Sequence, residues 1–218
     1  MSGGDAPQCP VCGTAAAEGF LVIGRLRYFR CPVCAVRFLH PDGYPDRAAE
    51  YAHYLHHENH PDDPDYRQFL SKLAVPLLDR LSSGACGLDY GCGPGPALAA
   101  MLREAGHPMA VYDPYFHPDA AALRQIYDFV TCSETAEHFH APAREFARLM
   151  RLVRPGGWLG VMTCFQTDDD LFAGWHYRKD PTHVVFYRAE TFRWLARAAG
   201  WSCDFPAKDV VLMQRPAG

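Results

Sequence analysis

The chain of 218 residues combines 49% hydrophobic with 21% charged residues, the balance of an ordinary globular protein, and its net charge of −4 gives no electrostatic reason to expect nucleic acid as a partner. No apolar run has membrane-spanning length and no basic-then-apolar signal peptide opens the chain, so the sequence predicts neither a membrane protein nor an exported one. Its nine cysteines, an odd number, lie mostly in apolar segments, which argues against a disulfide scaffold and predicts a reducing, cytoplasmic location.

The N-terminal segment, residues 1–40, carries two C-x2-C pairs separated by an 18-residue spacer. Two such turns can bring four thiolates together in a tetrahedral site with no open position, which suits a structural Zn²⁺ ion. The spacer predicts a hairpin, and about 40 residues build too small a core alone, so metal binding would supply folding free energy. We predict a zinc ribbon; the alternative is four reduced cysteines without metal. The candidate ligands are Cys9, Cys12, Cys31 and Cys34.

Residues 41–65 predict a connector that contains a short helix. Four of its histidines stand at i, i+3, i+4 and i+7, so that one helical face would carry His53, His56, His57 and His60. A second metal site is one interpretation. We favour a polar face beside the active site, because no acid or thiolate is fixed next to these histidines. Residues 66–81 then predict an amphipathic helix, which Pro76 should kink.

A short strand, a glycine-rich turn and a helix follow one another over residues 87–105. The turn is G-C-G-P-G at 91–95, and glycine allows both a sharp bend and a ligand lying against bare backbone. The free N–H groups where the helix begins favour an anionic ligand group. A second strand, at 109–112, ends in Asp113, 18 residues after Gly95, where a carboxylate can accept hydrogen bonds from both ribose hydroxyls.

The rest of the chain continues this alternation and predicts a doubly wound α/β sheet. The further expected strands lie at 127–134, 158–165, 201–205 and 210–214, and the further helices at 142–153 and 188–199. Only 14 residues separate Asp113 from Asp128, so one element has to be shortened there. The long segment 166–187 is predicted to be functional, because long loops in compact domains usually are.

The turn at 91–95, with the acid that precedes it, gives D-x-G-C-G-x-G, which resembles motif I of class I S-adenosylmethionine-dependent methyltransferases. It departs from the dinucleotide pattern G-x-G-x-x-G, because Pro96 stands at the third glycine. Residues 127–139 are similar to motif IV, and L-V-R-P-G-G-W-L-G-V-M-T resembles the helix, turn and strand that follow it. The resemblance covers about residues 66–215, within a domain that we place at residues 66–218. It implies a seven-stranded doubly wound sheet beside the zinc ribbon.

This resemblance implies S-adenosylmethionine as cofactor. The glycine backbone would border its methionine part, the first acid would position its amino group, and Asp113 would hold its ribose. No residue is assigned to the adenine, because the region of the third strand is short. The implied cofactor contacts are Asp89, Gly91, Cys92, Gly93, Gly95, Asp113, Ser133 and Glu134.

An oxygen or carbon acceptor has to lose a proton, and a histidine with a near-neutral pKa is a natural base. Three histidines compete for this role: His138 in the segment similar to motif IV, and His176 and His183 in the long segment. The long segment also supplies the candidate acceptor contacts Trp175, Tyr177 and Arg178.

The sequence therefore predicts methyl transfer to a small-molecule acceptor, a sugar- or quinol-like compound methylated on oxygen or carbon. One alternative is an RNA methyltransferase that clamps RNA with the ribbon arginines Arg25, Arg27, Arg30 and Arg37, although the acidic connector opposes it. Another is a non-catalytic adaptor. The acids at 168–170 offer a Mg²⁺ site, but consecutive acids are more often solvated. The oligomeric state stays open.

Overall fold

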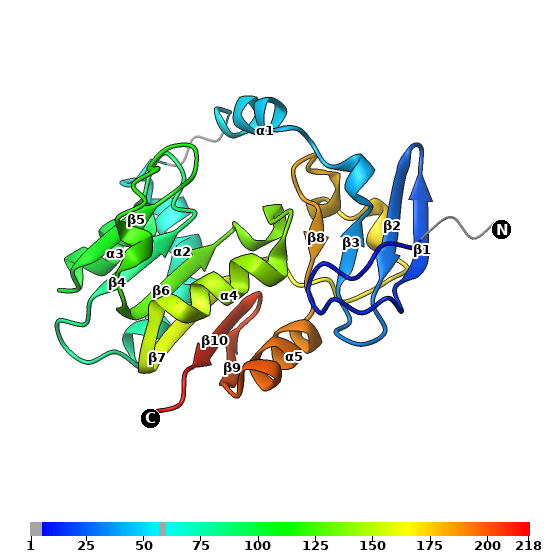
Figure 1. Ribbon diagram of the computed structural model, residues 1–218. Coiled ribbons are helices and arrows are strands. Elements are labelled where there is room, and N and C mark those ends of the chain that lie inside the picture. The colour runs from blue at the N-terminus through cyan, green and yellow to red at the C-terminus, as the bar shows by residue number, and fades with distance from the viewer. Residues whose placement is uncertain (1–5, 57–59) are drawn as a thin grey trace.

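The computed structural model describes residues 6–56 and 60–218, which form two β-sheets with helices around them (Figure 1). The smaller sheet is antiparallel, in the order β1-β2-β3-β8. Its strands are β1 (Glu18–Ile23), β2 (Leu26–Arg30), β3 (Arg37–Leu39) and β8 (Val185–Phe186). The hairpin predicted between the two cysteine pairs is thus confirmed, whereas β8 comes from the long segment late in the chain.

The larger sheet has six strands in the order β5-β4-β6-β7-β10-β9. Its strands are β4 (Gly87–Tyr90), β5 (Met109–Tyr112), β6 (Tyr127–Ser133), β7 (Val153–Met162), β9 (Ser202–Ala207) and β10 (Val210–Gln214). β5, β4, β6 and β7 pair in parallel with one another, and β10 runs antiparallel to both β7 and β9. This is the predicted doubly wound α/β architecture with an antiparallel last strand.

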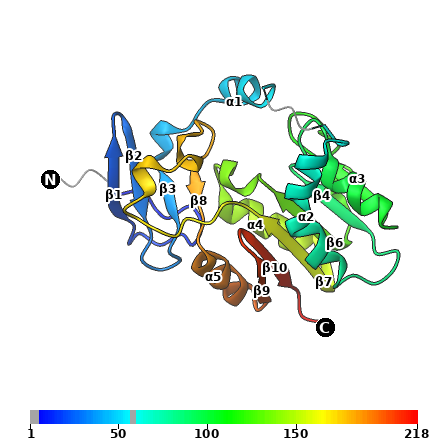
Figure 2. The ribbon, with the colours of Figure 1, turned by 180° about the vertical axis from the view of Figure 1, so that it is seen from behind.

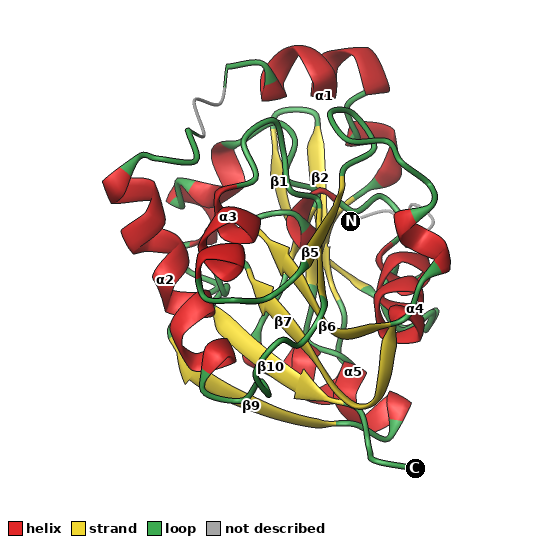
Figure 3. Ribbon diagram, turned by 90° about the vertical axis from the view of Figure 1, so that its left-hand side faces the viewer, coloured by secondary structure: helices red, strands yellow, loops and turns green. Residues whose placement is uncertain are grey.

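Helices α2 (Pro64–Leu78), α3 (Ala97–Glu104), α4 (Pro142–Leu152) and α5 (Ala189–Ala199) cover the two faces of the larger sheet, whereas α1 (Arg47–Tyr54) lies away from these faces (Figure 1). The 3-10 turns are at Pro41–Gly43, Ala122–Arg124, Ala136–His138, Phe172–Gly174 and Tyr177–Lys179. Figure 3 shows α2 and α3 on one side of the sheet and α4 on the other, and Figure 2 shows α2 from behind. The larger sheet has a hydrophobic core on each face, and successive side chains of β10 point into one and then the other. Leu212 packs in the core under α2 and α3, and Val211 packs in the core under α4 and α5.

The predicted seventh strand does not form. Residues 113–126, all of them described, contain only a 3-10 turn at Ala122–Arg124 and an isolated bridge between Asp113 and His117. The physical reason is length, because so short a connection cannot hold both a crossover helix and another parallel strand. As a result β5 is the edge of the sheet.

Local elements lie close to where the sequence places them. The strands Gly87–Tyr90 and Val210–Gln214 match their predicted bounds, and α5 ends at Gly200, whose φ of 70° gives the left-handed cap that glycine favours. The Pro-Gly-Gly turn is different. β7 begins at Val153, and its register against β6 shifts across this stretch, so the expected turn is a bulge within the strand.

The predicted row of histidines on one helical face is wrong. Helix α1 ends at Tyr54, so His56 and His60 lie beyond it, and His57 lies outside the described residues. Of the four, His53 is on the helix, where its Nε2 lies 3.0 Å from Oδ2 of Asp180.

Several long-range contacts join the N-terminal sheet to later parts of the chain, and two of them involve β3. β3 pairs with β8, which places Phe38 opposite Val185. The guanidinium of Arg37, which is buried, donates to both carboxylate oxygens of Asp169 at 3.0 and 2.6 Å. The N-terminal sheet therefore includes β8, a strand that begins two residues after His183. Among the described helices, none has both the length and the apolar character that crossing a membrane requires.

Candidate functional site

A cavity of about 660 Å³ opens at the carboxyl ends of β4, β5 and β6. β5 and β6 lie on opposite sides of β4, so the cavity is at the switch point of the sheet, where α/β folds bind their ligands. The predicted cofactor residues that line it are Asp89, Gly91, Cys92, Gly93, Asp113, Ser133 and Glu134. Gly95 is not among its lining residues. His138 and His183 line the same cavity together with Glu137.

The glycine turn is held in a shape that side chains would disturb. Gly91 and Gly93 have φ values of 76° and 65°, in the left-handed region. A Cβ atom added at Gly91 would lie 2.1 Å from Cγ2 of Thr135. Asp113 fixes the turn from the neighbouring strand, because its Oδ2 accepts a hydrogen bond from the Gly93 N–H at 3.0 Å. Its Oδ1 accepts from the N–H groups of Tyr115 and Phe116.

Asp89 presents a buried carboxylate to the cavity. Its residue is 3% exposed, and its Oδ1 accepts a hydrogen bond from Oγ1 of Thr131 at 2.8 Å. Burial raises the pKa of Asp89 to about 6, which leaves the carboxylate ionised at neutral pH. A buried negative charge of this kind favours a cationic ligand group beside it.

Glu134 differs from Asp89 in its charge. Burial, together with the nearby charge of Glu137, raises the pKa of Glu134 to about 9, so it is neutral at physiological pH. Its backbone has a φ of 46°, a conformation that costs a non-glycine residue energy and is concentrated at functional sites. The hydroxyl of Tyr177 donates to its Oε2 at 3.4 Å.

Glu137, His138 and His183 all line the cavity and form a group, which we call the Glu-His-His cluster. Oε1 of Glu137 lies 3.8 Å from Nε2 of His138 and 4.0 Å from Nε2 of His183. The two rings meet edge to face, with centroids 4.7 Å apart. Burial lowers the pKa of His183 to about 4, so its imidazole is neutral at physiological pH.

The other residues predicted for catalysis and acceptor binding lie elsewhere. His176, Trp175, Tyr177 and Arg178 are not among the residues that line the cavity. Trp175 packs against Phe186 of β8, with ring centroids 6.0 Å apart. Arg178 donates to the hydroxyl of Tyr28 at 3.3 Å. Trp175 and Arg178 therefore face the N-terminal sheet, and Asp180 and His183 line the cavity. Tyr177 lies between them, because its hydroxyl donates to Glu134 and its ring packs against His183 with centroids 4.2 Å apart.

Comparison with protein families gives a match to the methyltransferase domain family over residues 51–204. The chain belongs to this family. The predicted enzyme class, S-adenosylmethionine-dependent methyltransferase, is thereby confirmed, and so is the predicted fold class apart from the number of strands. No curated protein matches the sequence.

Solved structures share the fold at low sequence identity. The 1,6-didemethyltoxoflavin-N1-methyltransferase of Burkholderia thailandensis, solved with 1,6-didemethyltoxoflavin and S-adenosylhomocysteine, is 17% identical, with a TM-score of 0.53 over 93% of this chain and 100% of that one. A possible exported protein of Bordetella parapertussis is 16% identical, with a TM-score of 0.50 over 78% of this chain and 79% of that one. An O-methyltransferase family protein of B. thailandensis is 17% identical, with a TM-score of 0.47; the match covers 79% of this chain but 64% of that one.

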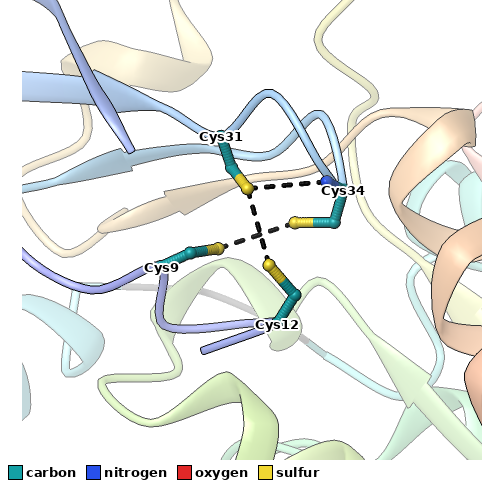
Figure 4. A group of neighbouring side chains, drawn as sticks. All are labelled: Cys9, Cys12, Cys31 and Cys34. Carbon is teal, nitrogen blue, oxygen red and sulfur yellow. Dashed lines mark hydrogen bonds between the residues drawn. The ribbon is translucent and has the colours of Figure 1, made fainter. Parts of the chain in front are cut away.

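The four N-terminal cysteines of the methyltransferase come together as predicted (Figure 4). Sγ of Cys9 lies 3.5 Å from Sγ of Cys34, and the same distance separates Cys12 from Cys31. All four sulfur atoms are within 4.8 Å of one another. Tetrahedral Zn–S bonds of about 2.3 Å place sulfur atoms about 3.8 Å apart, so the four sulfurs fit a structural Zn²⁺ ion.

Sequence reasoning missed the acids that complete the methyltransferase cavity. Glu137 follows the strand that ends at Ser133, and the adjacent His138 is a usable signal, because a Glu-His pair after a central strand offers both an acid and an imidazole. Glu50 gave no such signal. It stands on α1, and its carboxylate accepts from the hydroxyl of Tyr115 and lies 2.9 Å from Nε2 of His140.

The aspartates at 168–170, considered for Mg²⁺, are engaged in other contacts. Asp169 pairs with Arg37, and Oδ1 of Asp168 accepts a hydrogen bond from the Asp170 N–H. Among the described residues, the groups of side chains arranged to hold a metal ion are the four cysteines and the Glu-His-His cluster, and they include none of these aspartates.

Proposed function

We propose that this methyltransferase transfers the methyl group of S-adenosylmethionine to an oxygen or carbon of a small-molecule acceptor of the sugar- or quinol-like class. The observation that carries the proposal is that the motif I turn and the Glu-His-His cluster line one and the same cavity. Such a cavity can hold two reactants in contact. Positioning of that kind contributes about 7–11 kcal/mol to catalysis.

The cofactor would lie along the carboxyl ends of β4 and β5. Asp89 would bind its ammonium group, and the backbone at Gly91 and Gly93 would border its methionine part. Asp113 would accept a hydrogen bond from a ribose hydroxyl, since a carboxylate has about four lone-pair sites and three backbone N–H groups use three of them. Cys92, Ser133 and Glu134 would border the same ligand.

The acceptor would lie between the cofactor's methyl group and the Glu-His-His cluster. In the reaction the acceptor atom forms a bond to the methyl carbon while the carbon–sulfur bond breaks, and its electron pair goes to sulfur. The products are S-adenosylhomocysteine and the methylated acceptor. An acceptor hydroxyl also loses its proton, and we assign that step to the cluster, because His138 and His183 line the same cavity.

Two observations support a small molecule over RNA. The Burkholderia N1-methyltransferase, whose fold matches almost the whole chain, was solved with a small molecule and S-adenosylhomocysteine. In addition, three of the ribbon arginines are already paired: Arg27 with Asp42, Arg30 with Glu18 and Arg37 with Asp169. Paired arginines have less positive charge to offer to phosphates.

The three segments of the chain would then have different roles. We propose that residues 1–40 act as a zinc-stabilised brace, that 41–65 connect it, and that residues 66–218 carry the transfer reaction. The brace would act through β8, which pairs with β3 and follows His183 in the chain. Reduced zinc-ligating thiolates fit the cytoplasmic location that the cysteine content predicts.

A methylation screen tests this function. Zinc-replete protein is incubated with S-adenosylmethionine and pools of sugars, phenols, quinols and RNA, and products are detected by the mass of an added methyl group. The expected result is methylation in a small-molecule pool and none in RNA. Methylated RNA without any methylated small molecule would instead support the ribbon clamp.

A further inference from the structure

We propose that Glu137, His138 and His183 bind a divalent transition-metal ion at the acceptor end of the cavity. This site is separate from the four-cysteine site, and its use in catalysis rests on the proposed function. The ion would bind the hydroxyl of the acceptor. Three features of the cluster carry the proposal: the spacing of its donor atoms, the hydrogen bonds behind them, and a buried carboxylate oxygen.

The donor atoms of the cluster lie close together. Nε2 of His138 and Nε2 of His183 lie 3.8 and 4.0 Å from Oε1 of Glu137, and each of the three side chains has a ligand atom within 4.8 Å of those of the other two. Ligand bonds of about 2.0–2.1 Å in tetrahedral geometry place donor atoms about 3.4 Å apart. Small side-chain movements of a few tenths of an ångström per atom therefore close the site around an ion.

The hydrogen bonds behind the donors are those of metal ligands. Nδ1 of His138 lies 3.1 Å from the carbonyl oxygen of Thr182, and Nδ1 of His183 lies 2.7 Å from that of Tyr177. A carbonyl only accepts, so each Nδ1 carries a proton, and Nε2, the nitrogen nearer to Glu137, is the atom through which each ring would bind a metal ion. Histidines that bind metals have this arrangement, with the remote nitrogen bonded to a carbonyl or carboxylate.

The carboxylate has one satisfied and one unsatisfied oxygen. Glu137 is 0% exposed, and its Oε2 accepts a hydrogen bond from Oγ1 of Thr163 at 2.9 Å. Its Oε1 is buried and, among the described residues, has no hydrogen-bond partner. A buried polar atom without a partner is costly, and a bound cation removes that cost.

The main chain also braces the cluster from the N-terminal sheet. The N–H of Val184 donates to the carbonyl of Glu137 at 2.9 Å, and the N–H of Leu39 donates to the carbonyl of Val184 at 2.8 Å. Two donors that are 46 residues apart in the chain, Glu137 and His183, are thereby held together by backbone hydrogen bonds. Such rigidity suits a preformed metal site.

The donor set indicates the kind of ion. Two imidazoles and one carboxylate favour zinc, iron(II), cobalt, nickel or manganese over magnesium and calcium, which prefer oxygen ligands. Three protein ligands also leave coordination positions open, as in catalytic rather than structural sites. These positions face the cavity, because all three side chains line it.

The ion would act on the proton of the acceptor without changing its own oxidation state. The hydroxyl oxygen binds the ion, and its proton leaves to solvent more readily because the cation stabilises the oxyanion. The oxyanion then forms the bond to the methyl carbon, the carbon–sulfur bond breaks, and S-adenosylhomocysteine and a methyl ether result. His138 and His183 act as ligands in this step.

Cobalt titration tests the site. Co²⁺ is added to zinc-replete protein, whose cysteine site is already filled, and visible absorption and calorimetry follow its binding. We expect one further ion per chain, with the weak bands of nitrogen and oxygen ligands and without thiolate charge-transfer absorption. The double variant His138→Ala, His183→Ala and the single variant Glu137→Gln should each lose this binding by at least about tenfold.

The control is His176→Ala, which removes a histidine outside the cavity lining and should leave cobalt binding unchanged. Absence of a further ion in the wild-type protein, or equal binding by the double variant, would overturn the proposal and leave the histidines as direct bases. Titration with S-adenosylhomocysteine shows whether each variant is folded, and it tests the cofactor half of the proposed function independently of cobalt binding.

Discussion

Replacement of Asp89 by asparagine separates its role in cofactor binding from its effect on stability. The carboxylate is 3% exposed and is ionised at neutral pH, although burial raises its pKa to about 6. If it binds the ammonium group of the cofactor, the variant loses a charge-assisted hydrogen bond worth about 1.5–3 kcal/mol. Affinity for S-adenosylhomocysteine should then fall about 10- to 150-fold.

The stability of the cofactor-free protein should change in the opposite direction. The pKa of Asp89 rises from 3.8 in the unfolded chain to about 6 in the folded protein, so the unfolded state loses its proton first and stability falls between about pH 4 and pH 6. Above this window the folded protein carries a penalty of roughly 3 kcal/mol. Asp89→Asn removes the charge, and the new amide oxygen can still accept from Thr131. The melting temperature at neutral pH should therefore rise by several degrees.

Calorimetric titration and thermal unfolding of the same samples measure both effects. Asp204→Asn is the matched control, because this aspartate pairs with Arg80 on the surface and should change neither quantity. In the wild-type protein, affinity should also decrease as the pH is lowered through about 6, since Asp89 then becomes protonated. Unchanged affinity in Asp89→Asn, or a lower melting temperature, would refute the reasoning.

Three further changes test other parts of the account. Gly91→Ala puts a Cβ 2.1 Å from Thr135 at a φ of 76°, so it should destabilise the protein by at least about 2 kcal/mol and weaken cofactor binding. Gly174→Ala is the control, because no atom lies within 4 Å of the added Cβ, and it should do neither. Equal melting temperatures for the two variants would contradict the packing argument. Cys34→Ser should lose zinc, measured by elemental analysis, and turnover with it, because the ribbon braces β8; full turnover without zinc would contradict that link. His183→Ala should lower turnover by about 10²- to 10⁴-fold with cofactor affinity nearly unchanged, and full turnover would show that the cluster does not act on the acceptor.

What the sequence predicts well is local. The strand Gly87–Tyr90, the glycine turn and the acid at the end of β5 follow from short-range rules of burial, backbone freedom and spacing, and the structure brings Asp89 and Asp113 to one cavity. The cysteine cluster is predictable for the same reason, because each half of it is a single tight turn.

What the sequence does not predict depends on long-range pairing. β8 has two residues and no recognisable pattern of its own, yet its pairing with β3 decides that His183 reaches Glu137 while Trp175 and Arg178 face the N-terminal sheet. The length of the segment 166–187 predicted that all of it is functional. Length alone could not distinguish the part that faces the N-terminal sheet from the part that lines the cavity. The missing seventh strand was partly predictable. The sequence shows that the connection between Asp113 and Asp128 is too short for all the expected elements, but it does not show which element is absent.

The central claim is that the cavity at the ends of β4 and β5 binds S-adenosylmethionine. Titration of S-adenosylhomocysteine into zinc-replete wild-type protein tests it most directly. The account predicts saturable binding of one ligand per chain, weakened both in Gly91→Ala and in Asp89→Asn. Folded, zinc-replete protein that releases no heat with either the cofactor or its demethylated product would contradict it.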